Sequence, residues 1–174
     1  MSVLVAVASR HGATQEIAAA IGVAIHAGGF RVDVVRLSDP PESGSRPDPS
    51  EYEAVVLGSG VYLGRWLAPA REFVLQNDEA LRAMPVWAFS SGPIGDEHAD
   101  AGQHAPVIAL AATINPVEYR VFGGKLDRQG LGLVERVVVS AIRAQDEDDR
   151  DWDDITAWAN GIADVLKART VSRS

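Results

Sequence analysis

Short apolar runs that alternate with amphipathic segments restrict this chain to few folds. Residues 2–8, 54–58 and 86–90 are almost continuously apolar, which is typical of strands buried on both faces of a parallel sheet. Residues 30–37 and 117–122 supply two further strands, and helices are expected over residues 14–27, 67–83 (with a break near Asn77), 105–114, 131–144 and 151–167. This alternation predicts an α/β fold: a doubly wound sheet of five parallel strands in the order 2-1-3-4-5, with helices on both faces.

Two of the expected helices have well-defined apolar faces. In the first helix, one face is formed by Ile17, Ile21, Ala24 and Ile25. In the last helix, one face is formed by Trp152, Ile155, Ala159, Ile162 and Leu166. Three acids, Asp151, Asp153 and Asp154, stand at the amino end of the last helix, where its dipole favours negative charge.

Size and charge limit the classes of protein that remain. The chain has 174 residues, and we expect one domain over residues 1–170 and a disordered tail over residues 171–174. It has no cysteine, which excludes disulfides and thiolate metal sites, and no metal site is predicted. The net charge of −8, of which seven acids and one arginine between Asp146 and Asp154 supply −6, argues against nucleic acid as a partner. No apolar run reaches the ~20 residues of a membrane span and no basic leader is present, so a cytoplasmic protein is predicted.

The segment between the first strand and the first helix suits an anion. Free N–H groups at a helix amino terminus favour a phosphate, and hydroxyls and a glycine help to hold it. The lysine of a nucleoside-triphosphate loop and the GxGxxG spacing are both missing, so we expect a phosphate monoester that is held and not transferred. The alternative is a polar turn with a threonine cap. The candidate residues are Ser9, Arg10, His11, Gly12, Ala13 and Thr14.

The segment that follows the third strand combines glycines, aromatics and a cation. Glycines bring the backbone close to a flat ligand, and the ring of Tyr62 can cover the face of that ligand. Trp66 is expected to pack in the core instead. The candidate residues are Ser59, Gly60, Val61, Tyr62, Gly64 and Arg65.

A third segment, after the fourth strand, also has small residues and glycines, although alone it would be an ordinary turn. Its candidate residues are Ser91, Gly92, Pro93, Ile94 and Gly95. In a sheet of the order 2-1-3-4-5 the three segments lie side by side at the carboxyl ends of the strands, where such sheets bind ligands. One segment suits a phosphate and two suit a planar group, which together predict FMN.

Five stretches carry a resemblance to a known family: SRHGATQEIA (9–18), GSGVYLGRW (58–66), SSGPIG (90–95), FGGKLD (122–127) and RDWDDITAWA (150–159). On these the chain resembles the flavodoxin-like superfamily over nearly its whole length. Within it, the chain is most similar to the flavodoxin-domain proteins that include menaquinone-dependent protoporphyrinogen oxidase. The resemblance implies the flavodoxin-like form of the doubly wound sheet, with the FMN phosphate at residues 9–14 and the isoalloxazine between the other two segments.

Two positions depart from the flavodoxin pattern. His11 stands where flavodoxins usually have a hydroxyl residue, and it either donates to the phosphate when protonated or points to solvent. The usual ring-stacking tryptophan is not plainly present, so the stacking partner stays open.

The expected function is that of an FMN-dependent oxidoreductase, protoporphyrinogen oxidase-like, which passes electrons from a small-molecule donor to a quinone-like acceptor. Arg65 would stabilise the reduced flavin if it faces the pyrimidine side of the ring. His98 and His104 are either proton shuttles or ordinary surface histidines. The alternatives are a non-catalytic flavodoxin electron carrier that docks to redox proteins, and a scaffold that has lost flavin.

Residues 124–144 interleave basic and apolar residues. The oxidase resemblance implies a role for this segment in association with membrane or quinone. Read from its residues, it is either a basic amphipathic helix that touches a membrane surface or a core-facing helix with a charged outer side.

Overall fold

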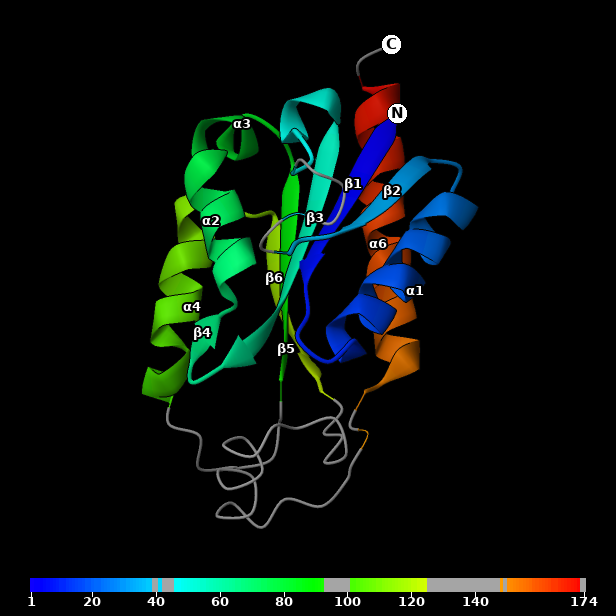
Figure 1. Ribbon diagram of the computed structural model, residues 1–174. Coiled ribbons are helices and arrows are strands. Elements are labelled where there is room, and N and C mark those ends of the chain that lie inside the picture. Colours follow the sequence, from blue (N-terminus) through cyan, green and yellow to red (C-terminus); the bar gives the residue numbers. More distant parts are fainter. Residues whose placement is uncertain (39–40, 42–45, 93–100, 125–147, 149, 173–174) are drawn as a thin grey trace.

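A computed structural model describes residues 1–38, 41, 46–92, 101–124, 148 and 150–172, with the backbone alone for residues 101–105. Five parallel strands form the sheet: β1 (Ser2–Ala8), β2 (Arg31–Arg36), β3 (Ala54–Tyr62), β5 (Val86–Gly92) and β6 (Glu118–Gly123). Their order is β2-β1-β3-β5-β6, which confirms the predicted topology, and the two-residue strand β4 (Arg65–Trp66) pairs with β3 alone (Figure 1).

Helices cover both faces of the sheet, as the alternation predicts (Figure 1). One face carries α1 (Ala13–Ala27) and α6 (Trp152–Val171), and the other carries α2 (Ala68–Gln76), α3 (Asp78–Arg82) and α4 (Ala101–Thr113). A short 3-10 turn, η1 (Pro49–Glu51), precedes β3. The predicted break near Asn77 is confirmed, because Asn77 (φ −125°) separates α2 from α3. No described helix is both long and apolar enough to cross a membrane.

The strand β1, which lies between β2 and β3, contributes to two separate cores. Its alternate residues Val3, Val5 and Val7 pack with α1 and α6. The residues between them, Leu4, Ala6 and Ala8, pack with the α2–α4 side. A strand with helices on both faces needs apolar side chains in both directions, and this explains why residues 2–8 show no polar alternation.

The apolar face predicted for the last helix is wrong at its first residue. Ile155, Ala159, Ile162 and Leu166 are buried, but Trp152 is 40% exposed and lies beneath the Arg150 guanidinium, 4.6 Å from the ring centroid. Trp158 is buried in its place, because the rings of Phe89 and Phe122 offer it edge-to-face contacts at 6.1 and 5.5 Å.

The sequence predicts a loop over residues 58–66, and this prediction is wrong, because most of the segment is a strand. β3 continues to Tyr62 because β5 pairs with it as far as Gly60, and the chain then folds back into β4 as a two-residue hairpin. Leu63 and Gly64 form its turn with φ of 49° and 69°, the left-handed pair that a tight hairpin of this twist requires. The predicted helix at 131–144, and nearly all of residues 124–144, lie outside the described residues.

Candidate functional site

The turn between β1 and α1 leaves the amino end of the helix without a side-chain cap. Gly12 precedes the helix at a φ of +90°, and its N–H donates to Ser9 Oγ over 3.0 Å. The alternative in which Thr14 caps the helix is therefore wrong. The first intrahelical bond runs from the Glu16 N–H to the Gly12 carbonyl, so the N–H groups of residues 13–15 have no carbonyl partner within the helix. Such a helix end favours an anion.

Gly60 marks the point at which the three predicted segments meet. A Cβ placed on Gly60 would lie 3.3 Å from Thr14 Oγ1 and 4.0 Å from the Ser91 carbonyl oxygen. The sheet register produces this meeting, because β1 ends beside Ser59 and Gly60 is paired with Ser91. The Thr14 hydroxyl, from the turn between β1 and α1, and the backbone of β5 at Ser91 thus both approach Gly60 of β3, which has no side chain.

Two hydroxyl residues fix the hairpin to the sheet. Ser59 Oγ accepts a hydrogen bond from the Leu67 N–H at 3.0 Å and donates one to the Gly60 carbonyl at 2.8 Å. The Trp66 Nε1–H donates to Ser90 Oγ over 2.7 Å, and Ser90 Oγ also lies 2.6 Å from the Tyr119 hydroxyl. Trp66 is 2% exposed, which confirms that it packs in the core. Burial raises the pKa of Tyr119, although its bond to Ser90 acts in the other direction.

Tyr62, at the end of β3, contacts Arg10 in the turn between β1 and α1, and we call this exposed edge the mouth of the site. The Arg10 guanidinium lies over the Tyr62 ring, 4.8 Å from its centroid. Both side chains are exposed, as is that of His11, whereas Val61 is half-buried. This cation–π contact joins the first segment to the hairpin at the surface, where it adds about 0.5–1 kcal/mol.

The end of β5 supplies Ser91 and Gly92, which lie against the neighbouring strands. A Cβ on Gly92 would be 3.5 Å from Val61 Cβ, and the Gly92 backbone is within 3 Å of where a Cβ on Gly124 would stand. The candidates Pro93, Ile94 and Gly95 lie outside the described residues, as do His98 and the side chain of His104.

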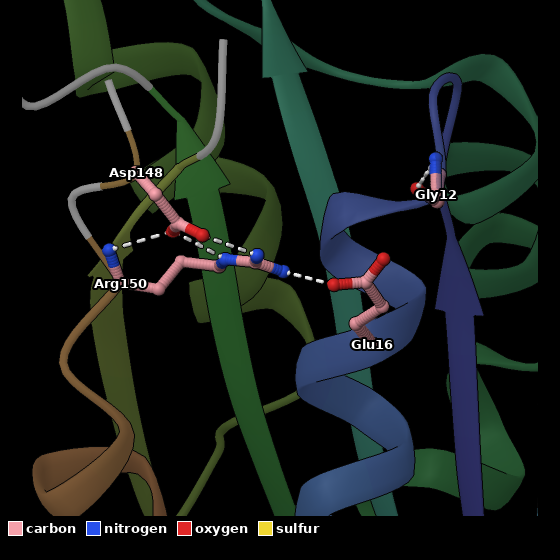
Figure 2. Close-up of polar contacts among 5 residues, drawn as sticks. Gly12, Glu16, Asp148 and Arg150 are labelled. Atoms are coloured by element: carbon pink, nitrogen blue, oxygen red, sulfur yellow. Dashed lines mark hydrogen bonds and ion pairs between the residues drawn. The ribbon is translucent and has the colours of Figure 1, made fainter. Parts of the chain in front are cut away.

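An arginine that the sequence analysis did not single out holds the first turn of α1. Arg150, whose side chain is 3% exposed, contacts Glu16 at 2.5 Å and Asp148 at 2.6 Å (Figure 2). Hydrogen bonds to Asp148 and then to Glu16 raise the pKa of the Arg150 guanidinium despite its burial. In the sequence, the signal that could have indicated this role is that Arg150 is the one cation in the acidic run 146–154.

The residues present fit a phosphorylated planar cofactor. The uncapped helix end and the hydroxyl of Thr14 suit its phosphate, and nothing lies within 4 Å of the position of a Cβ on Gly12. Gly60 presents backbone without a side chain beside the Thr14 hydroxyl, and glycine suits a close approach of backbone to a flat group. A doubly wound sheet with these features at the carboxyl ends of β1, β3 and β5 defines a flavodoxin-like protein.

The chain belongs to the flavodoxin domain family, whose model matches residues 4–153. Membership of this family indicates FMN as the cofactor. No curated protein sequence matches the chain.

Solved structures share the fold at low sequence identity. A flavodoxin from the domain Archaea aligns with a TM-score of 0.59 and 21% identity over 96% of this chain and 99% of its own. Flavodoxin 2 from Bacillus cereus aligns with a TM-score of 0.57 and 20% identity over 96% and 99%. Rubredoxin oxygen:oxidoreductase from Desulfovibrio gigas aligns with a TM-score of 0.63 and 13% identity over 97% of this chain but only 37% of its own.

Proposed function

We propose that this protein is an FMN-dependent oxidoreductase that takes electrons from a small-molecule donor and delivers them to a quinone-like acceptor, with protoporphyrinogen oxidase-like chemistry. The distribution of charge supports this proposal. Residues 9–14, 58–64 and 90–92 carry Arg10 and His11 and no acid. Among the residues that the structure describes, the carboxylates of Glu16 and Asp148 are both paired with Arg150. A cationic mouth suits a small electron-rich or anionic molecule better than a basic protein surface.

Bound FMN supplies the electron chemistry, and the residues of this chain bind and orient it. In the proposal, the N–H groups at the start of α1 and the Thr14 hydroxyl hold the phosphate, with Ser9, Arg10, His11 and Ala13 around it. The backbone at Gly60 and Gly92 approaches the ring, and Ser91, Val61 and Gly64 complete this part of the site. Tyr62 is the aromatic side chain at the mouth. Arg65 is exposed on β4 and lines a groove beside α2, so its contact with the ring stays a prediction.

Turnover by the purified, FMN-loaded protein tests the proposal. We expect it to oxidise protoporphyrinogen with menadione as acceptor under anaerobic conditions for many cycles per flavin. Porphyrin fluorescence reports the product, and free FMN at the same concentration is the control. Transfer that stops after one flavin equivalent would contradict the proposal.

An electron carrier is the second candidate, because the archaeal and Bacillus cereus neighbours are flavodoxins of similar length and the net charge is −8. A carrier would exchange electrons once with a redox protein and show no steady-state turnover of small molecules. The same assay therefore separates the two candidates.

Thr14→Ala is expected to weaken FMN binding by about 1–2 kcal/mol, roughly 5- to 30-fold in Kd, because one charge-assisted hydrogen bond to the phosphate is lost. Quenching of FMN fluorescence on titration with the apoprotein measures this Kd. Thr156→Ala, which removes an exposed hydroxyl on α6, is the matched control and should bind FMN like the parent. Equal affinities of the two variants would mean that the phosphate lies elsewhere.

A further inference from the structure

An open groove of about 470 Å³ lies between the hairpin strand β4 and the helices α2 and α4. These three elements lie side by side on the face of the sheet opposite α1 and α6 (Figure 1). The groove is therefore on the outer side of the hairpin, away from the turn between β1 and α1. Its volume is in the range of small-molecule sites, which are commonly about 300–1,000 Å³.

Two arginines line the groove without a partner. Within the part of the chain that the structure describes, neither Arg65 nor Arg71 makes a hydrogen bond or an ion pair. The Nε atom of Arg71 is buried and has no acceptor. The acid in the lining, Glu72, does not neutralise them, because it is bound by Arg46 at 2.6 Å. The two Nη groups of Arg71 are not buried in this way, and they are the donors that a ligand in the groove can reach.

The remaining walls are mainly apolar. Leu75 of α2 is 69% exposed, and it faces the same groove as Pro106 and Leu110 of α4. Trp66 closes the end beside β4, and its indole N–H is already bound to Ser90. Leu75, Pro106 and Leu110 therefore offer apolar surface to a ligand, whereas the indole of Trp66 offers it no free hydrogen-bond donor.

We propose that this groove binds a small amphipathic carboxylate. A guanidinium pairs with a carboxylate through two parallel N–H···O bonds, which the two Nη groups of Arg71 can supply. The apolar part of the ligand would cover Leu75, Pro106 and Leu110, which removes their surface from water. A single carboxylate fits better than a polyanion, because the net charge of −8 on the whole chain opposes a highly charged ligand. The proposal does not depend on the reaction at the flavin.

Calorimetric titration of the full-length FMN-loaded protein with decanoate, below its micelle concentration, tests the proposal. We expect saturable binding that is at least tenfold tighter than that of decanol, which lacks the charge, or of acetate, which lacks the chain. Arg71→Gln is expected to weaken decanoate binding about tenfold and to leave the FMN content unchanged. If the first variant folds poorly, Arg65→Gln, at an exposed position, is expected to weaken decanoate binding in the same way.

The matched control is Arg82→Gln, which removes an exposed arginine on α3 that pairs with Asp78 outside the groove. It should bind decanoate like the parent. The proposal is overturned if decanoate does not saturate, if decanol binds equally well, or if the Arg71 and Arg65 variants bind like the Arg82 variant. Binding of an acidic amphipathic peptide in place of decanoate would also overturn it, since the groove would then be a protein interface.

Discussion

Gly60→Val is expected to lower FMN affinity at least ~100-fold, the largest effect on binding that we predict. A Cβ at this position already stands 3.3 Å from Thr14 Oγ1, tighter than an ordinary contact, and two further methyl groups would extend into the space where β1, β3 and β5 end. The loss corresponds to about 2.7 kcal/mol or more. Fluorescence titration with FMN measures it.

The variant should still fold, because its closest new neighbour is a side-chain hydroxyl and not backbone. Its far-UV circular dichroism is expected to match that of the parent. Gly161→Ala is the matched glycine control: a Cβ there meets nothing within 4 Å, and FMN binding should not change. A Gly60→Val protein that binds FMN within threefold of the parent would show that the ring does not lie at this point.

Gly58→Ala is expected to have the largest effect on stability, a loss of about 3 kcal/mol or more. A Cβ on Gly58 would stand 2.1 Å from Phe89 Cζ, inside the aromatic ring's own volume. Phe89 cannot easily move, since Phe122 and Trp158 pack against it with centroids 5.8 and 6.1 Å away. Overpacking of a well-filled core costs about 1–3 kcal/mol, and the rigid ring places this site at the upper end or beyond.

Thermal denaturation of the apoprotein measures this effect. At ~2–4 °C for each kcal/mol in a chain of this size, the midpoint should fall by about 6–12 °C. The double variant Gly58→Ala with Phe89→Leu should be less destabilised than the sum of the two single variants, because the smaller side chain relieves the contact. A midpoint within 2 °C of the parent for Gly58→Ala would contradict the packing described here.

The sheet could be predicted because each strand has a strong local signal. Residues 3–8 are all apolar and lie between Ser2 and Ser9, and the structure places β1 at Ser2–Ala8, the bounds that were predicted. The order of the strands followed from the alternation with helices, since parallel strands joined by right-handed crossovers leave few arrangements. The convergence of the three candidate segments was a consequence of that order.

The hairpin could not be predicted, because pairing between distant segments decides it. Gly58 and Gly60 weaken an isolated strand, and this is why a loop was predicted from residue 58. In the folded chain β1 and β5 flank Ser59 on both sides, and their ladders hold the backbone extended. The turn uses Leu63, which has no intrinsic preference for a left-handed conformation, so the usual Asn-Gly signal was missing.

The roles of Trp158 and Arg150 were also missed for reasons of tertiary packing. Both Trp152 and Trp158 lie close to the face that holds Ile155, and helical spacing does not choose between them. The choice depends on Phe89 and Phe122, which are remote in sequence. Arg150 is one cation among seven acids, and only the fold brings Glu16 of α1, 134 residues away, into contact with it.

The meeting of three chain segments at Gly60 has a consequence for biosynthesis. Thr14, Gly60 and Ser91 are far apart in sequence, and they become neighbours only when β1, β3 and β5 have all been added to the sheet. If FMN binds where these residues meet, as proposed, a nascent or partly unfolded chain has no site for it, and the cofactor binds only after these strands have joined the sheet. By mass action, free FMN at 100 times its Kd would add ~2.7 kcal/mol to the cost of unfolding. In a cell poor in riboflavin, the same polypeptide would lose this protection and become more susceptible to proteases, so that vitamin supply would influence its abundance.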